Sequence, residues 1–155
     1  MATFIGDYTC KLDVKGRIIL PVAFKKQLPS GAQDHFVVRR DIFERCLVLY
    51  SIEDWNRQID RIRASINPYN REHNVFLRNF FKGTAELILD GNNRLLIPRR
   101  LLDLAGIKKD VVLAGQDGRI EMWAADQYEK IDMPTDDFAN LAEKLMGNRL
   151  IAPGE

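Results

Sequence analysis

Two stretches of the 155-residue chain share one pattern: LDVKGRIILP at residues 12–21 and LDGNNRLLIP at residues 89–98. Leu, Asp, Arg and Pro coincide at an offset of 77 residues, and three aliphatic residues separate the Arg from the Pro in both copies. The same offset pairs Phe4 with Phe81. Because residues that match at a fixed offset are typical of an internal repeat, we predict two copies of one structural unit.

Each copy predicts a strand, a tight turn and a second strand. Residues 8–12 and 85–89 have the composition of strands, and so do the aliphatic segments 17–20 and 94–97 that follow the turns. The turns themselves read DVKG and DGNN, and Gly, Asn and Asp all suit tight turns or positive φ. Asp and Arg therefore stand at the two ends of each loop.

Helices and hairpins are predicted after these strands. A proline ends each second strand and suits the first turn of a helix, so we predict helices at about 21–28 and 98–105, with Gly106 as the C-cap of the latter. Each copy then continues into a hairpin. The two predicted hairpins pair residues 36–38 with 46–50 and residues 111–113 with 119–123.

Helical periodicity marks the segment between the copies and the end of the chain. Ser51 opens a capping-box pattern, and apolar residues recur at helical spacing from Trp55 onward until Asn67-Pro68 breaks the pattern. A second apolar stripe follows at 76–81. A last amphipathic helix is predicted to be capped at Thr135, with apolar residues at 138, 141, 142, 145 and 146 on one face.

Size and linkers decide how the copies are arranged. A copy of about 55 residues buries little core by itself, and no flexible Gly/Ser/Pro-rich linker separates the two. We therefore predict an α+β fold, mostly β, in which two repeats share a pseudo-two-fold β-barrel core with short flanking helices. The predicted segments are a first repeat at 4–54, a helical linker at 55–80, a second repeat at 81–128, and a C-terminal helix and tail at 134–150.

Composition excludes several classes of protein. The chain has 29% charged and 46% hydrophobic residues, which is typical of globular domains. No apolar run approaches the ~18 residues of a membrane span, and no signal peptide is recognisable. Cys10 and Cys46 are too few for a disulfide framework and fit a reducing cytoplasm.

Residues suited to catalysis are few. His35 and His73 are the only histidines, and neither has metal-ligand spacing to an acid or a cysteine. No phosphate-binding glycine loop is present, and Ser30, Ser51 and Ser65 lack a nucleophile-elbow pattern. Cys46 is expected to be a small core residue. We therefore expect neither an enzyme nor a metal site.

The formal net charge is only +1, but it is unevenly distributed. The balance is +3 in residues 1–28, +4 in 55–82 and +3 in 90–109, against −4 in 126–155. Basic segments beside acidic ones are a weak pointer to a polyanionic partner. An ordinary mixed surface is the alternative interpretation.

The duplicated Asp-x-x-x-Arg loop is the candidate site. In a structural interpretation, the Asp accepts hydrogen bonds from the turn and pairs with the Arg to fix the connection. In a functional one, Asp13 and Asp90 fix the loops and direct Arg17 and Arg94 outward, while Lys15 adds a second cation to the first tip. Two such tips related by symmetry could straddle phosphates or enter a groove of nucleic acid.

At these residues the chain resembles the MraZ family, a tandem member of the AbrB-like (SpoVT-AbrB, swapped-hairpin or looped-hinge) superfamily. Both Asp-x-x-x-Arg loops, their aliphatic triplets and prolines, and their spacing carry a resemblance that covers roughly residues 4–146. It implies two AbrB-like repeats and a bacterial transcriptional regulator of the division and cell-wall gene cluster. It further implies a ring-shaped homo-oligomer that binds short direct repeats in promoter DNA, associates with the nucleoid in the cytoplasm, and uses no cofactor, membrane or small-molecule substrate.

The resemblance also implies roles for individual residues. The implied DNA-binding residues are Arg17 and Arg94, with Lys15 as an auxiliary, and the loop-organising residues are Asp13, Gly16, Asp90 and Gly91. The second loop carries one positive charge fewer, because Asn92 replaces Lys15, and it has Asn93 in place of Gly16. Arg99 and Arg100 follow the second loop and could compensate.

Two other functions stay open at this point. The amphipathic segment 138–146 and the acidic end of the chain suit a ring-forming protein-interaction module without a primary role on DNA. An antitoxin-like member of the same superfamily is the third alternative, although such proteins usually carry one copy and dimerise. Binding to repeat DNA, compared with random DNA, distinguishes these hypotheses.

Overall fold

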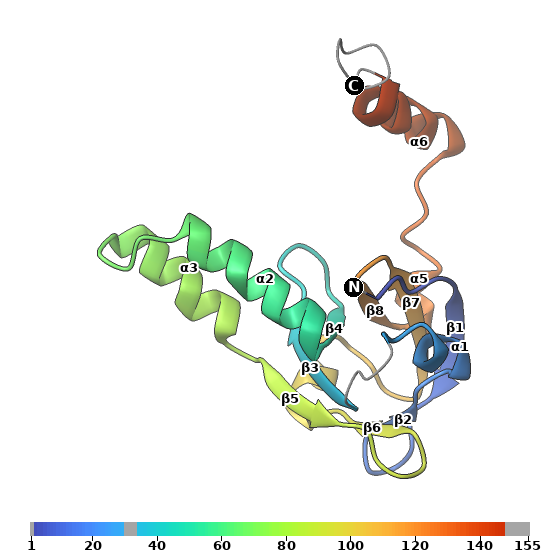
Figure 1. Cartoon of the computed structure of the whole chain (residues 1–155). Coiled ribbons are helices and arrows are strands. Elements are labelled where there is room, and N and C mark those ends of the chain that lie inside the picture. Colours follow the sequence, from blue (N-terminus) through green and yellow to red (C-terminus); the bar gives the residue numbers. More distant parts are fainter. Residues whose placement is uncertain (1, 30–33, 148–155) are drawn as a thin grey trace. The chain divides into compact units, whose positions relative to one another are not determined.

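Six strands form one antiparallel sheet in the computed structural model, which describes residues 2–29 and 34–147 (Figure 1). The strand order is β1-β7-β8-β4-β3-β5. The strands, in chain order, are β1 (Asp7–Lys11), β3 (His35–Arg40), β4 (Leu47–Ser51), β5 (Ala85–Ile88), β7 (Asp110–Gln116) and β8 (Arg119–Ala124). The two predicted hairpins are confirmed as β3 with β4 and β7 with β8.

The second strand of each repeat lies outside this sheet. β2 (Arg17–Ile19) pairs with β6 (Arg94–Leu96) to form a separate two-stranded ribbon, and neither strand pairs with the strand that precedes it in the chain. The predicted strands therefore exist, but each loop joins two strands that belong to different sheets.

The topology is symmetric under exchange of the two repeats. The 77-residue offset maps β1 to β5 and β2 to β6, and the hairpin β3–β4 corresponds to β7–β8. Replacing every strand by its counterpart reverses the order of the large sheet and leaves the ribbon unchanged. A pseudo-two-fold axis therefore passes between the central strands β4 and β8 and through the ribbon.

The predicted closed barrel is wrong. β1 and β5 are the two edges of the large sheet, and they do not pair with each other or with the ribbon. The physical reason is that the backbone of each repeat leaves the large sheet at its loop. The strand after the loop then pairs with the equivalent strand of the opposite repeat. Hydrogen bonding is therefore divided between an open sheet and a ribbon and does not continue around the core.

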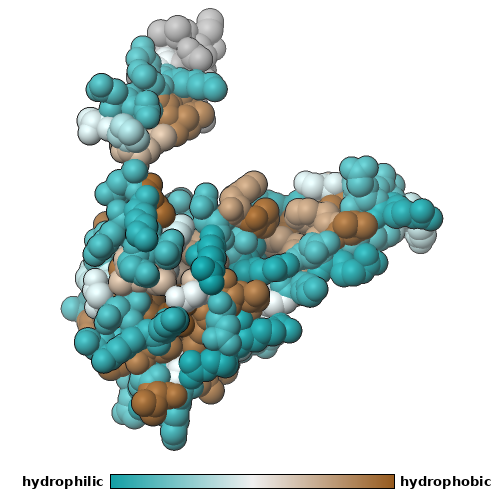
Figure 2. All heavy atoms as spheres, turned by 180° about the vertical axis from the view of Figure 1, so that it is seen from behind, coloured by the Kyte–Doolittle hydropathy of each residue, from teal (hydrophilic) through white to brown (hydrophobic). Residues whose placement is uncertain are grey.

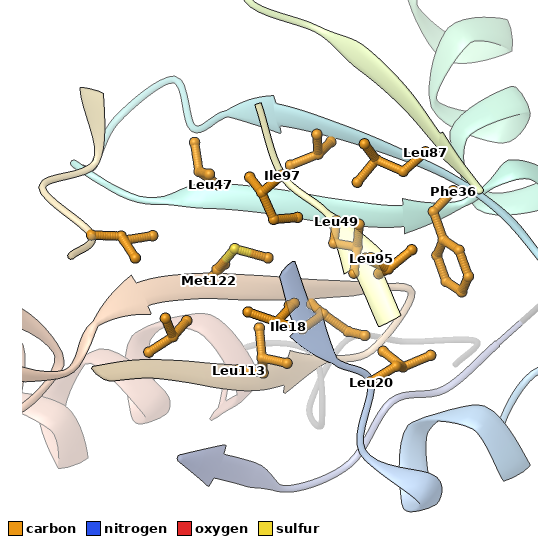
Figure 3. Packing of buried hydrophobic residues seen from close by; sticks show 14 of the residues in the cluster. Ile18, Leu20, Phe36, Leu47, Leu49, Leu87, Leu95, Ile97, Leu113 and Met122 are labelled. Carbon is orange, nitrogen blue, oxygen red and sulfur yellow. The ribbon is translucent and has the colours of Figure 1, made fainter. Parts of the chain in front are cut away.

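The two repeats share one core, as predicted. Ile18 of β2 and Leu95 of β6 are fully buried, and they lie in one hydrophobic cluster with residues of β4, β7 and β8 (Figure 3). Leu49, Leu113 and Met122 are members of the same cluster. Because neither repeat completes this core by itself, the ribbon is attached to the sheet from both halves of the chain.

A short helix follows each ribbon strand. α1 (Val22–Lys26) and α4 (Arg99–Leu104) begin directly after the prolines at 21 and 98, which lack the N–H that a longer strand would need. The C-cap of α4 is Ala105, one residue before the predicted Gly106, which follows it with a left-handed φ of +66° and ends the helix.

Two longer helices, which we call the arm, extend from the sheet between the repeats (Figure 1). They are α2 (Ile52–Ser65) and α3 (Arg71–Phe81). Ser51 caps α2, since its hydroxyl accepts from the N–H of Asp54 and donates to the Asp54 carboxylate at 2.8 Å. Trp55, Ile59 and Ile62 form a second core with Phe80 and with the face of β3 and β4 that points away from the first core.

The arm keeps apolar side chains on its surface. Figure 2 shows hydrophobic residues among hydrophilic ones along it. Phe76 and Phe81 are 42% and 45% exposed, respectively. Two helices without a third layer bury only part of their apolar stripes, which explains this exposure.

The described residues 126–147 belong to a second compact unit. Within the described residues, the chain continues through α5 (Ala125–Tyr128), α6 (Thr135–Ala142) and a π-helical turn, η1 (Glu143–Gly147). Pro134, and not Thr135 as predicted, is the N-cap of α6, and no side chain caps it. Residues 148–150 of the predicted C-terminal segment, and Ser30, lie outside the described residues.

Candidate functional site

The first Asp-x-x-x-Arg loop is held by its aspartate. The Oδ1 atom of Asp13 accepts hydrogen bonds from the backbone N–H groups of Lys15 at 2.9 Å and Arg17 at 2.8 Å. Its Oδ2 atom accepts from Nε of Arg17 at 2.7 Å. The carboxylate therefore fixes both the backbone of the turn and the direction in which the Arg17 side chain leaves it.

The second loop repeats this arrangement bond for bond. Asp90 accepts from the N–H groups of Asn92 and Arg94 at 2.8 and 2.9 Å, and from Nε of Arg94 at 3.0 Å. The same backbone bond closes both turns, from Gly16 N to Asp13 O at 3.1 Å and from Asn93 N to Asp90 O at 3.0 Å. Two different sequences, DVKG and DGNN, thus adopt one conformation.

The last residue of each loop explains how this is achieved. Gly16 has a φ of +88° and Asn93 a φ of 59°, and glycine and asparagine are the residues that tolerate this region best. A Cβ at Gly16 would also lie 3.2 Å from the carbonyl oxygen of Ile97. A Cβ at Gly91 would meet nothing within 4 Å, and Gly91 is not among the residues with positive φ, so its role in organising the loop stays a prediction.

Each loop is also bonded to the strand of the opposite repeat. Leu20 N donates to Asn93 O at 2.8 Å, and the equivalent bond runs from Ile97 N to Gly16 O at 2.9 Å. These bonds continue the pairing of β2 with β6 beyond the ribbon. The loops therefore form one symmetric structure, in which the position of either depends on the other.

The ribbon brings the two arginines to one face. Arg17 lies opposite Leu96, and Ile19 lies opposite Arg94, with the buried pair Ile18 and Leu95 between them. Because side chains alternate across a strand, the residues flanking that pair all point outward. Arg17 and Arg94 are diagonal neighbours on this face, a relation that separates backbone positions by about 7–8 Å.

The arginines are neither buried in the core nor fully extended into solvent. The side chains of Arg17 and Arg94 are 25% and 27% exposed, because each lies against its aspartate. Beyond them, Val14 and Lys15 at the tip of the first loop are exposed, as are Gly91 and Asn92 at the second. The only charged side chain at the extreme tip of either loop is thus Lys15.

Electrostatics favour the ionised aspartates. The backbone hydrogen bond from Arg17 is the first cause that lowers the pKa of Asp13, joined by the bonds from its side chain and from Lys15. The equivalent contacts of Arg94 and Asn92 lower the pKa of Asp90. Both carboxylates therefore remain charged and keep their arginines oriented at neutral pH.

Three residues near the loops were missed in the sequence, and a fourth, Arg99, makes a contact that the sequence did not show. Lys25 of α1 donates to Oδ1 of Asn93 at 2.5 Å, and Arg99 of α4 reaches the carbonyl oxygen of Val14 at 3.5 Å. Arg99 thus contacts the first loop, and its compensation for the charge of the second loop stays a prediction. Ile19 and Leu96, 61% and 55% exposed, supply the apolar part of the outer face. The alternation of strand residues would have placed both beside the arginines.

The buried cysteine, Cys46, lies outside the loops and is unreactive. Burial raises the pKa of Cys46 to about 12, so this residue is an unreactive part of the core, as expected. No group of three or more His, Cys, Asp or Glu side chains in the described ranges could hold a metal ion. None of the described helices has both the length and the apolar character needed to cross a membrane.

Comparisons with known proteins agree with the duplicated loops. A family model described as "MraZ protein, putative antitoxin-like" matches residues 3–79 and again residues 80–149. The chain is 44% identical over 149 residues to the transcriptional regulator MraZ of Christiangramia forsetii, covering 96% of both proteins. It is 42% identical to that of Flavobacterium psychrophilum, over 96% of the chain and 94% of the relative.

A third relative, the transcriptional regulator MraZ of Bacteroides fragilis, is 40% identical over 94% of the chain and 92% of its own length. The alignments thus include both loops and the arm between the repeats. A match of the family model to each half, together with relatives aligned over nearly the whole length, shows that the chain belongs to the MraZ family.

Proposed function

We propose that the protein is a sequence-specific DNA-binding transcriptional regulator of the bacterial division and cell-wall gene cluster, acting on short promoter repeats as a ring-shaped homo-oligomer. Its relatives are named as transcriptional regulators. The observation that carries the proposal is the shared outer face of the ribbon, where Arg17 and Arg94 lie at diagonal positions.

The shape of this face suits a DNA groove. The major groove of B-DNA admits a two-stranded β-ribbon, and arginine is the commonest reader of guanine there. Ile19 and Leu96 can contact thymine methyl groups beside the guanidinium groups. The tips of the loops, with Lys15 on one of them, would lie at the phosphate backbone.

The aspartates contribute by preorganising the arginines. A free arginine side chain loses considerable rotamer entropy when it is immobilised. Here Asp13 and Asp90 already hold Nε of the two arginines, so part of this entropy is lost on folding and not on binding. The outer Nη groups are the atoms that would donate to a base edge.

A single ribbon offers few contacts, which is the argument for an assembly. Nonspecific complexes of this kind have a Kd on the order of 10⁻⁴–10⁻⁶ M at physiological salt. Neighbouring subunits that engage successive repeats raise the apparent affinity by about 10²–10⁴ through effective concentration. Such a complex on a promoter would obstruct RNA polymerase.

The proposal is tested by the binding of the whole chain to the DNA upstream of its own reading frame, measured by fluorescence anisotropy at a stated salt concentration. Arg17→Ala and Arg94→Ala should each weaken binding by about 10–100-fold, the effect of losing one good base contact. Arg17→Lys should restore little, because a lysine cannot form the bidentate contact.

Arg63→Ala is the matched control, because it also removes one arginine charge. Its partner is Asp60, and both side chains are well exposed on α2, away from the ribbon. Sedimentation velocity should give the same oligomer for all variants. If Arg17→Ala binds the repeat DNA as tightly as the unmodified chain, the assignment of the loops is wrong. If the unmodified ring binds repeat and shuffled DNA equally, the protein-interaction alternative is favoured.

A further inference from the structure

Arg39 is buried, and no carboxylate of the described residues forms an ion pair with it. Its side chain lies on the face of β3 that packs against the arm, and the residue is only 3% exposed. Among the described residues, the other buried polar groups, Ser51 and Asp54, bond to each other, and Asp54 also pairs with Arg57. A buried positive charge is costly unless it is paired, so Arg39 requires an explanation.

The contacts of the Arg39 guanidinium satisfy it only in part. Nη1 donates to the carbonyl oxygen of Arg40 at 2.9 Å, and Nη2 donates to the Tyr50 hydroxyl at 3.3 Å. The group lies 4.4 Å from the centre of the Phe80 ring, a cation–π contact. Nε is buried and has no hydrogen-bond partner. All of these contacts are with neutral groups.

A pocket of about 290 Å³ lies beside this group. It exists because β5 pairs with β3 only as far as Val38, opposite Ala85, so that the last two residues of β3 extend past the neighbouring strand. Side chains of α3, the helix that leads into β5 (Figure 1), line the pocket. Its walls include Arg39 and Arg40 of β3, Asp41 and Ile42 of the following loop, and Phe76 and Phe80 of α3.

The charges of the walls define the ligand. Arg39 and Arg40 are opposed by Asp41 alone, whose Oδ2 is engaged by the backbone N–H groups of Phe43 and Glu44 at 3.1 and 2.9 Å. The balance of one positive charge matches a monoanion. The planar guanidinium matches a carboxylate, and the aromatic and aliphatic walls match an apolar body.

We propose that this pocket binds a small organic carboxylate with a single aromatic ring or a branched aliphatic group. An apolar cavity of about 150 Å³ holds benzene, so the larger volume here accommodates a ring and a carboxylate together. The carboxylate accepts from the Arg39 guanidinium, and the ring packs against the apolar walls that Phe76 and Ile42 form. The inference concerns a site separate from the loops and does not depend on DNA binding.

The test is calorimetric titration of the full chain with phenylacetate, and with 2-phenylethanol as the neutral analogue of the same size. Phenylacetate should bind with a Kd on the order of 1 mM or tighter, as expected for a ligand of this size, and the alcohol at least tenfold more weakly. Arg39→Met should reduce phenylacetate binding at least tenfold. Because replacing a buried charge by an apolar side chain is often tolerated, this variant should fold, which thermal unfolding checks.

A second pair of variants keeps the proposal testable if Arg39→Met fails to fold. Phe76→Ala removes a wall of the pocket. The control is Phe81→Ala on the same helix, because the Phe81 ring has a similar exposure and also contacts Phe80 but does not line the pocket. Phenylacetate binding should weaken several-fold in the first variant and stay unchanged in the second. Equal binding of the acid and the alcohol, or unchanged binding by Arg39→Met or Phe76→Ala, would overturn the proposal.

Discussion

The backbone N–H of Leu20 donates to the carbonyl oxygen of Asn93 at 2.8 Å, although the two residues belong to different repeats. Its symmetric counterpart joins Ile97 to Gly16. Each Asp-x-x-x-Arg loop is therefore closed by the opposite repeat, and local changes in one loop are expected to affect the geometry of the other.

The inner and outer faces of the ribbon should respond differently to truncation. Leu95→Ala removes a fully buried side chain from the shared core and should lower the free energy of unfolding by about 2–5 kcal/mol. Leu96→Ala, one residue further on, removes a side chain that is 55% exposed and should cost well under half as much. Chemical denaturation measures both, and equal losses would contradict the assignment of the two faces.

The two loop glycines, Gly16 and Gly91, should differ in how much stability the protein loses when each is replaced by alanine. Gly16→Ala forces a Cβ into a left-handed backbone and towards the Ile97 carbonyl, at a cost of about 1–2 kcal/mol. Gly91→Ala places a methyl group in open space and should leave stability within about 0.5 kcal/mol of the unmodified chain. Thermal unfolding under identical conditions is the measurement. A larger loss for Gly91→Ala than for Gly16→Ala would mean that the strained position has been misassigned.

The loop aspartates should make stability dependent on acid pH. Hydrogen bonds from Arg17 lower the pKa of Asp13 in the folded chain, so its stabilising effect is present above the ordinary value of 3.8 and is lost as the pH falls through the lower, folded value. Asp13→Asn should therefore be less stable than the unmodified chain at pH 6, and the difference should shrink at pH values below 3.8.

Denaturant unfolding between pH 6 and pH 2 measures this difference. Asp60→Asn is the control, because it removes a carboxylate from an exposed pair on α2 that contributes little to stability. If the stability curves of Asp13→Asn and the unmodified chain stay parallel over the whole range, the proposed linkage does not hold.

Salt should weaken DNA binding if Lys15 meets a phosphate. The logarithm of the affinity should fall linearly with the logarithm of the salt concentration. Lys15→Ala should make this slope shallower by about one for each loop that contacts the DNA. It should lower the affinity for repeat DNA and for shuffled DNA by similar factors. Arg63→Ala, which removes a positive charge from the arm, should leave the slope unchanged. A slope near zero for the unmodified chain would argue against phosphate contacts.

Local sequence signals predicted the elements well. The prolines at 21 and 98 set the starts of α1 and α4, Ser51 capped α2, and Gly106 ended α4. These features depend on interactions within a few residues, which a single sequence displays directly. The repeat itself also required the two halves to be similar in structure, as the symmetric strand order confirms.

Pairing between strands that lie far apart in the chain was harder to predict from the sequence. The alternation in residues 17–19 shows that Ile18 is buried, but it does not show whether the neighbouring strand is β1 or β6. The barrel was predicted from the shared core, which does not determine whether the strands close around it. The burial of Arg39 was equally hidden, because it depends on where α3 lies over β3.

The candidate loops, too, were predictable from the sequence only in part. Their aspartate–arginine spacing indicated a fixed turn, but it could not show that both guanidinium groups lie on one face, since that relation arises only from the cross-pairing of the ribbon. Arg99 makes a contact that was hidden for the same reason. It follows the second loop in sequence but reaches Val14 in the first.

Because both repeats belong to one chain, the two ends of the ribbon can differ in sequence. A dimer of identical single repeats would present two equal tips and would look the same from either end of a duplex. In this chain one tip carries Lys15 and the other Asn92, so the ribbon has a distinguishable head and tail. If the ribbon binds DNA as proposed, this built-in direction suits operators whose half-sites follow one another in the same orientation, and mutation can tune the two ends independently.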